Sequence, residues 1–288
     1  LNNLENIFFM KNIALAFSLL FFISLTNAVA QSVYPCAFNH YMDIRYQEDP
    51  SLLEMREEYE EEIQSIINSR SIFTSKTIPV VVHIIYNDSY SNISDAQVNS
   101  AMTAINEDFN ASNSDFNSVI SAFSSIKSNL NISFALANLD PNGNSTTGIT
   151  RTQSNFTDNA GENVKSLIMW DTDMYLNVWV VDNIEDGAGA YAYYPGTAPG
   201  GAEGIVCRHS QFGTTGTSSS SNFAATTMTH EIGHYLNLAH TWGDSNDPEL
   251  DSNCNYDDNV SDTPNTIGTL YGCNTAQSTC GSLDNVQN

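Results

Sequence analysis

The segment His230-Glu231-Ile232-Gly233-His234-Tyr235-Leu236-Asn237-Leu238-Ala239-His240 combines three histidines and one glutamate at fixed spacing. His230 and His234 are four residues apart, so on a helix they lie one turn apart on the same face. Two imidazoles in that position can supply half of a tetrahedral zinc site, in which metal–nitrogen distances are about 2.0–2.1 Å. The spacing therefore predicts a helix that presents a metal-binding pair.

The third histidine can join this pair only if the helix ends. In a continuous helix, the six residues from His234 to His240 would rotate the side chain by roughly 240° and move it about 9 Å along the axis. We therefore expect the chain to turn back near Asn237, because Asn tolerates the left-handed backbone conformation better than most residues. His240 would then become the third zinc ligand.

Glu231 adds the second part of the chemistry. Three neutral histidines leave the fourth zinc position to a water, which is typical of catalytic zinc sites. The metal lowers the pKa of that water, and an adjacent carboxylate can take its proton during attack on a peptide carbonyl. The motif thus predicts a zinc hydrolase with Glu231 as general base. A surface helix with this spacing by accident is the alternative, and the third histidine at the required offset disfavours it.

The first thirty residues have the pattern of a secretory signal peptide. Met10 and Lys11 begin it, residues 13–25 form an apolar run too short to span a bilayer, and residues 28–30 form an A-x-A cleavage site. We expect residues 1–30 to be upstream sequence and signal peptide, with Met10 as initiator. The mature protein is expected to be extracellular, with no membrane insertion after signal cleavage.

The charge of the chain limits its partners. The sequence has 33 acidic and 9 basic residues, a formal net charge of −24. Such a balance argues against binding to nucleic acid or to anionic membranes. It suits a secreted protein that binds calcium, and it says nothing about oligomeric state.

Hydrophobic periodicity predicts alternating helices and strands. A helix is expected from Asp49-Pro50 onward, Ile78–Tyr86 has the pattern of a buried strand, and Ser94 begins a capping box before a helix that ends near Phe109. Within the first strand, His83 is expected to be a hydrogen-bonded core residue. Further strands are expected at residues 131–137, 175–182, 190–194 and 204–208, and the zinc helix at residues 222–236.

This order of elements predicts an α+β fold. We expect a mixed twisted sheet with helices and the zinc helix, an irregular Gly/Asn/Asp-rich lower subdomain after the zinc motif, and the metal between the two. Residues 31–76 form a separate leading segment, expected to be a propeptide, and residues 77–288 form the catalytic domain. The polar stretch 69–77 is the expected place of an activating cleavage.

Beyond these patterns, the chain resembles the pappalysin family of metzincin peptidases, including its ulilysin- and cytophagalysin-like members. The resemblance implies a zinc endopeptidase acting on protein or peptide substrates, whose extended backbone pairs with an edge strand at residues 190–194. It also implies a calcium ion near Asp262 and Thr263. The matching segments are residues 78–83, 147–151, 175–179, the zinc motif with Thr241-Trp242, and residues 261–264.

The resemblance also implies roles for several cysteines. Cys254 would pair with Cys280, and Cys273 with a cysteine beyond residue 288. Cys207, in a strand-like run, is expected to be a buried thiol.

Cys36 lies in the leading segment, where similar enzymes use a cysteine as a zinc ligand that displaces the catalytic water and keeps the zymogen latent. Family members usually follow this cysteine with Gly, whereas Ala37 follows it here. Pairing of Cys36 with Cys207 or Cys273 is the alternative.

Members of the family also carry a Met-turn below the zinc, shortly after a segment like residues 284–288. No methionine follows Met228, so we expect the sequence to stop before that turn and to lack the tyrosine that often follows it.

Two other functions agree with parts of the sequence. In another type of zincin, a carboxylate such as Asp244 would replace His240 as third ligand. In a non-catalytic secreted surface or adhesion protein, the motif would hold a structural zinc. Glu231 disfavours the second of these, because a structural site does not need that carboxylate.

Overall fold

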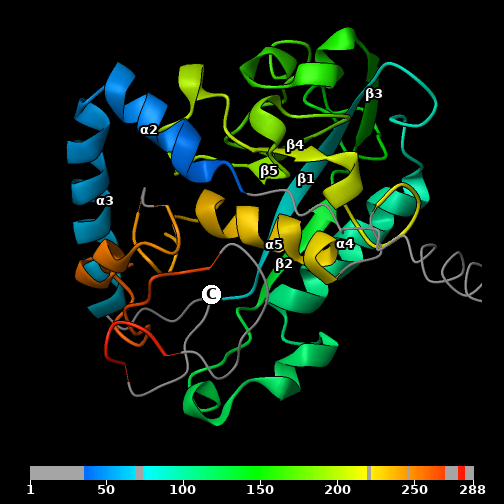
Figure 1. Cartoon of the computed structure of the whole chain (residues 1–288). Coiled ribbons are helices and arrows are strands. Elements are labelled where there is room, and N and C mark those ends of the chain that lie inside the picture. Colours follow the sequence, from blue (N-terminus) through cyan, green and yellow to red (C-terminus); the bar gives the residue numbers. More distant parts are fainter. Residues whose placement is uncertain (1–35, 69–73, 219–221, 245–246, 270–277, 283–288) are drawn as a thin grey trace, which may run out of the picture. The chain divides into compact units, whose positions relative to one another are not determined.

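We describe the chain from a computed structural model (Figure 1). None of the helices within its described residues has the length and apolarity that a membrane span requires. The structure describes residues 36–68, 74–218, 222–244, 247–269 and 278–282. The expected signal peptide, Cys273 and the segment 284–288 lie outside these ranges.

A six-stranded, mostly parallel sheet is built around β1 (Lys76–Tyr86). The first half of β1 pairs with β2 (Ile132–Leu136), its second half pairs with β3 (Ile149–Gln153), and β4 (Leu176–Val181) lies on its other side, all in parallel. The expected mixed sheet is confirmed, because the last strand, described next, runs antiparallel.

The edge of the sheet is formed by β5 (Ala190–Tyr191), which pairs antiparallel with β6 (Ile205–Arg208), and β6 pairs in parallel with β4. The strand expected at residues 190–194 is therefore wrong in length. The chain leaves β6 after Tyr191 and turns where the carbonyl of Tyr194 accepts a hydrogen bond from the amide of Thr197 at 3.1 Å. Pro195 between them lacks the N–H that a continuing strand would use.

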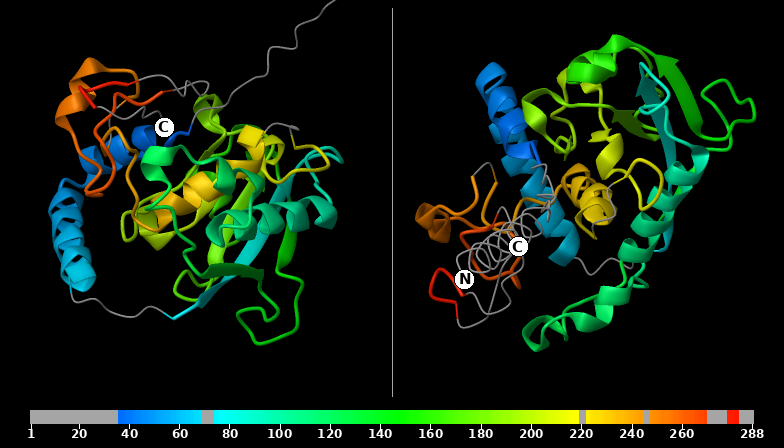
Figure 2. Two further views of the ribbon diagram at one scale, coloured as in Figure 1. Left: turned by 90° about the horizontal axis from the view of Figure 1, so that it is seen from below. Right: turned by 45° about the vertical axis from the view of Figure 1, so that its right-hand side comes forward.

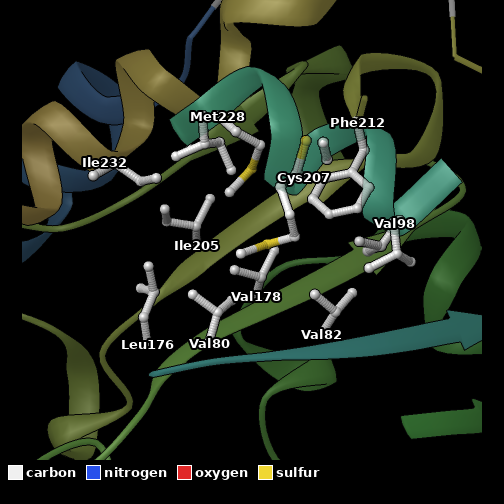
Figure 3. Packing of buried hydrophobic residues seen from close by; sticks show 14 of the residues in the cluster. Val80, Val82, Val98, Leu176, Val178, Ile205, Cys207, Phe212, Met228 and Ile232 are labelled. Carbon is white, nitrogen blue, oxygen red and sulfur yellow. The ribbon is translucent and has the colours of Figure 1, made fainter. Parts of the chain in front are cut away.

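Both faces of β1 are buried, as is usual for parallel strands. Val80, Val82 and Ile84 belong to a core that includes residues of α4 (Asp95–Phe109) and α5 (Asn222–Tyr235). Figure 3 shows Met228 and Ile232 of α5 above the valines of this core.

The opposite face of the sheet carries a second core rich in aromatic rings. Ile85 of β1, Trp179 of β4 and Tyr191 of β5 belong to it. His83 points to the same side and is fully buried, with Nδ1 2.7 Å from Thr150 Oγ1 and Nε2 2.9 Å from Asn177 Oδ1. The expected role of His83 as a core residue is confirmed.

Local sequence signals determine α4 well. The side chain of Ser94 accepts a hydrogen bond from the amide of Gln97 at 3.2 Å, so the predicted cap is confirmed. Val98, Ile105 and Phe109 are buried on one face of the helix.

The leading segment forms two helices, α2 (Phe38–Glu48) and α3 (Ser51–Asn68). The second was expected, whereas α2 was not, although its buried residues Phe38, Tyr41 and Met42 lie on one helical face. Phe38 and Met42 are fully buried, in the core on the second face of the sheet. Figures 1 and 2 show α2 (blue) beside α5.

After the zinc motif, the described residues form neither an α-helix nor a named strand, which agrees with the expected irregular subdomain. A disulfide joins Cys254 to Cys280, as the resemblance implied. Short 3₁₀ turns connect the main elements: Ser114–Ser118, Ser121–Phe123, Asn155–Asn159, Glu162–Val164, Glu185–Gly187, Pro199–Gly201, His209–Gln211 and Asp251–Asn255.

Candidate active site

The end of α5 turns back as the histidine spacing requires. The amide of Leu238 donates to the carbonyl of Gly233 at 2.9 Å, the amide of Asn237 donates to the carbonyl of His234 at 2.9 Å, and Asn237 has φ 79°. These bonds and the left-handed residue are those of a Schellman helix end. The predicted turn at Asn237 is therefore confirmed.

This turn brings the three histidines together. Nε2 of His230 lies 3.1 Å from Nε2 of His234 and 3.3 Å from Nε2 of His240. Nitrogens bound tetrahedrally to one zinc at about 2.0–2.1 Å would lie about 3.3–3.4 Å apart. His234 and His240 are buried, whereas His230 is exposed. The spacing of the nitrogens thus matches what one zinc ion requires.

The second ring nitrogens of two histidines are already in use. Nδ1 of His234 donates to the carbonyl of Leu238 at 2.8 Å, and Nδ1 of His240 donates to Oδ1 of Asn39 at 3.0 Å. These bonds direct each Nε2 lone pair toward the shared point. Burial lowers the pKa of His234 and His240 well below the ordinary value for histidine, and the neighbouring imidazoles add to this. Both rings are therefore neutral, the form that binds a metal.

A thiol completes the group of possible ligands. Sγ of Cys36 lies 3.8 Å from Nε2 of His234, and the ligand atoms of Cys36 and the three histidines all lie within 4.8 Å of one another. For zinc with a sulfur at about 2.3 Å, the corresponding separation is about 3.6 Å. The thiol thus occupies the fourth corner of the arrangement.

The backbone beside Cys36 explains this placement. Cys36 forms an isolated parallel bridge with Ala190 at the sheet edge, and the amide of Ala37 donates to the carbonyl of Ala190 at 3.1 Å. The thiols of Cys36 and Cys207 are free, and Cys207 is fully buried. The alternative pairing of these two cysteines is not formed, and the prediction of a buried Cys207 thiol is confirmed.

The carboxyl group of Glu231 lies beside this group of ligands. The residue is 1% exposed, and its Oε2 has no hydrogen-bond partner among the described residues. Burial raises the pKa of the carboxyl to about 8, against opposing hydrogen bonds from Cys36 and the backbone of Ala192. A buried carboxylate oxygen needs a hydrogen-bond partner, and a water bound to a metal at this place would be one. Imidazole, thiol and one carboxylate suit zinc, whereas calcium and magnesium take oxygen ligands.

Two residues of α2 that the sequence did not predict as site residues contact the histidines. The ring of Phe38 stacks on His234 with centroids 3.9 Å apart, and Asn39 accepts the hydrogen bond from His240. The available signal was that both residues closely follow Cys36 in the sequence. A cysteine that lies beside the histidines also places the residues that follow it near them.

The remaining predicted residues lie outside this group. Asp244 does not belong to it, and Oδ1 of Asp244 accepts a hydrogen bond from the hydroxyl of Tyr194. Asp262 and Thr263 line a cavity together with Lys127, whose Nζ donates to the carbonyl of Phe116 at 2.7 Å. Among the described residues, no three His, Cys, Asp or Glu side chains gather there.

Comparisons with known proteins agree with this geometry. The family described as pregnancy-associated plasma protein-A matches residues 158–288. Promirolysin of Tannerella forsythia, solved as a mutant, is 36% identical with a TM-score of 0.67, over 80% of this chain and 76% of that chain. Mature mirolysin from the same organism, in complex with a cleaved peptide, is 40% identical with a TM-score of 0.61, over 68% of this chain and 74% of that chain.

A curated relative gives the same class. An extracellular metalloprotease of Arthroderma benhamiae is 25% identical over 244 residues, which cover 80% of this chain and 77% of that protein. With the sheet, the histidine group and the solved relatives in agreement, the chain belongs to the pappalysin family of metalloendopeptidases.

Proposed function

We propose that the chain is a secreted zinc endopeptidase, in which His230, His234 and His240 hold the metal and Glu231 is the general base. The observation that carries the proposal is the set of Nε2 separations of 3.1 and 3.3 Å beside a buried carboxylate oxygen that has no hydrogen-bond partner among the described residues. A protein that only stores zinc would not need that carboxylate.

Each residue has a definite part in peptide hydrolysis. Bound zinc would lower the pKa of a water in its fourth position and polarise the substrate carbonyl. Glu231 takes the proton of that water as it attacks and passes it to the leaving amine. The raised pKa of Glu231 suits this exchange, because a carboxyl whose pKa lies near neutral both accepts and returns a proton. The edge of the sheet at Ala190 would pair with the substrate backbone.

We further propose that residues 31–76 are a propeptide that keeps the enzyme latent. The thiol of Cys36 stands at the corner that the catalytic water needs, and the amide of Ala37 uses the Ala190 carbonyl that a substrate would use. Burial and the nearby Glu231 raise the pKa of the Cys36 thiol, so a thiolate there requires a cation beside it. Zinc supplies that cation. The thiol therefore blocks only a metal-loaded site.

A second contact anchors the same segment. Arg56 of α3 is 7% exposed, donates to Oδ1 of Asn237, and lies over the ring of Tyr194 at 3.5 Å. Nδ2 of Asn237 in turn donates to Oε1 of Glu60 at 2.8 Å. The propeptide thus binds the very residue that turns the zinc motif back on itself.

Secretion is supported by the extracellular metalloproteases among the relatives and by the signal-peptide pattern of residues 1–30. The calcium ion near Asp262 and Thr263 stays a prediction from the resemblance.

The test compares the full-length protein before and after cleavage within residues 69–77, on denatured protein and on a peptide library. We expect bound zinc in both forms, and cleavage by the processed form alone. Glu231→Gln is the matched control, since it keeps the size of the side chain and removes the base. Equal cleavage by the wild type and Glu231→Gln would remove Glu231 from the mechanism.

A further inference from the structure

Tyr41 of the leading segment fills a site on the aromatic face of the sheet. The residue is 5% exposed, and its ring stacks on that of Tyr191 with centroids 3.9 Å apart and an interplanar angle of 19°. The ring of Tyr193 meets it edge-on at 6.0 Å. Its hydroxyl donates to Oε1 of Glu185 at 2.9 Å. The two tyrosine rings therefore bind the ring of Tyr41, and Glu185 binds its hydroxyl.

The walls of this site are held by the catalytic domain itself. The hydroxyls of Tyr191 and Tyr193 both donate to Oε1 of Glu162 at 3.1 Å. Nζ of Lys165, a residue that is 3% exposed, pairs with the same oxygen at 3.1 Å and donates to the carbonyl of Ala202 at 3.1 Å. None of these bonds involves the leading segment. The two rings should keep their positions after the propeptide has gone.

Glu185 is also placed by the catalytic domain. Its amide donates to the carbonyl of Ala160 at 3.0 Å. A Cβ on the adjacent Gly161 would lie 2.5 Å from Oε1 of Glu185, so only glycine leaves room for the carboxylate in this position.

The site lies directly along the edge at which a substrate would pair. Tyr191 follows Ala190 in β5, and Ala190 is the residue bridged to Cys36. The rings of Tyr191 and Tyr193 belong to the core on one face of the sheet, and Ala190 and Ala192 belong to the core on the other. An extended peptide paired to this edge would send alternate side chains to the aromatic face.

We propose that Tyr191, Tyr193 and Glu185 form a substrate subsite that takes a tyrosine side chain, and that Tyr41 occupies it in the latent protein. The proposal rests on the proposed function, because the subsite opens only when the leading segment leaves. The two rings favour an aromatic group, and the carboxylate favours one with a hydroxyl to donate. Lys165, with Nζ 4.7 Å from the Tyr193 ring and 5.4 Å from the Tyr191 ring, disfavours a basic side chain.

The experiment measures kcat/KM of the processed enzyme on fluorogenic peptides that differ at one residue. Tyr, Phe or Leu is placed in turn at each position around the scissile bond. We expect one position at which Tyr is preferred over Phe by about tenfold, which is the effect of one hydrogen bond to a charged group, and Phe over Leu by less. No preference for Tyr at any position would overturn the proposal.

Two amide variants then locate the preference. Glu185→Gln should reduce the Tyr-to-Phe ratio to about two- to threefold, because a neutral acceptor makes a weaker bond. Asp186→Asn is the matched control: it removes the same charge from the next residue, and Asn tolerates the φ of 61° at that position. It should leave the ratio unchanged. A ratio that survives Glu185→Gln, or that falls equally in both variants, would also overturn the proposal.

The result is separate from that of the proposed function. If no peptide is cleaved, or if Glu231→Gln cleaves as well as the wild type, the peptidase mechanism fails. Cleavage that depends on Glu231 but ignores the aromatic residue would refute the subsite alone.

Discussion

The zinc motif and the leading segment both contribute side chains to the candidate metal site, but different features of the sequence place them there. Residues 230–240 carry their geometry in their spacing, because a helical period and one left-handed residue bring the three histidines together. Residues 36–48 have no comparable pattern, yet Cys36, Phe38 and Asn39 all contact the histidines. The difference shows that ligands in one local motif can be derived from residue spacing, whereas Cys36 was expected only from the family resemblance and its neighbours Phe38 and Asn39 were not expected at all.

Asn237 connects the two regions. Its backbone makes the turn that the motif requires, and its side chain binds Arg56 and Glu60 of α3. Glycine would adopt the same turn conformation equally well, but it has no side-chain amide with which to bind Arg56 and Glu60. The residue that turns the motif is therefore also a contact point for the leading segment.

The largest expected effect comes from breaking the motif itself. In the processed form, His240→Asn should lower zinc affinity and kcat/KM by more than about 100-fold, because a lost ligand costs at least as much as a lost supporting bond. Zinc titration and peptide cleavage measure the two quantities. Asp244→Asn is the control and should keep the zinc. Retained zinc in His240→Asn, with loss in Asp244→Asn, would favour the carboxylate-ligand hypothesis.

The next effect separates the leading segment from the motif. In the unprocessed protein, Cys36→Ser should raise peptidase activity by about tenfold or more, because a hydroxyl is a much poorer zinc ligand than a thiolate. Cys207→Ala, which removes a second free thiol of the described residues, should leave the unprocessed protein latent. Activity that stays at the wild-type level in Cys36→Ser would show that the other contacts suffice for latency.

A smaller effect is expected at the residue that joins the two regions. Asn237→Gly keeps a residue suited to φ 79° and removes only the amide. It should weaken binding of the propeptide by about 1.5–3 kcal/mol, the contribution of a charge-assisted hydrogen bond in a buried setting. Thermal unfolding and residual activity of the unprocessed protein report this loss.

Arg56→Ala provides the second arm of this test. Because the two side chains share one hydrogen bond, the double variant should lose less than the sum of the two single losses. Fully additive losses would show that Arg56 and Asn237 act independently.

The smallest expected effect is on the stability of α4, whose helix cap depends only on neighbouring residues. Ser94→Ala removes the cap of α4 and should lower the free energy of unfolding by about 1 kcal/mol. Chemical denaturation measures it, with Ser94→Thr as the control that keeps a capping hydroxyl. Zinc content and latency should not change, since α4 supplies none of the grouped ligands.

Much of the fold was predictable because its signals are short in range. The buried run of β1, the cap at Ser94 and the turn at Asn237 each depend on a few neighbouring residues. The end of β5 was misjudged, because apolar residues continue to Tyr194 while the pairing with β6 stops at Tyr191. Helix α2 was missed because its apolar stripe, Phe38, Tyr41 and Met42, is short and the apolar Ile44 of the same helix is exposed, which weakens the contrast between its faces.

The sequence by itself determined the histidine motif, its turn and the class of enzyme, because these depend on residue type, helical period and backbone conformation. It also predicted Glu231 as the general base. Only the tertiary structure decided what stands against the motif: the Cys36 thiol at the fourth corner, Arg56 on Asn237, and Tyr41 between two tyrosine rings. The physical reason is separation along the chain. Contacts between residues more than 140 positions apart, such as Tyr41 and Glu185 at 144 or Cys36 and His234 at 198, depend on how whole elements pack.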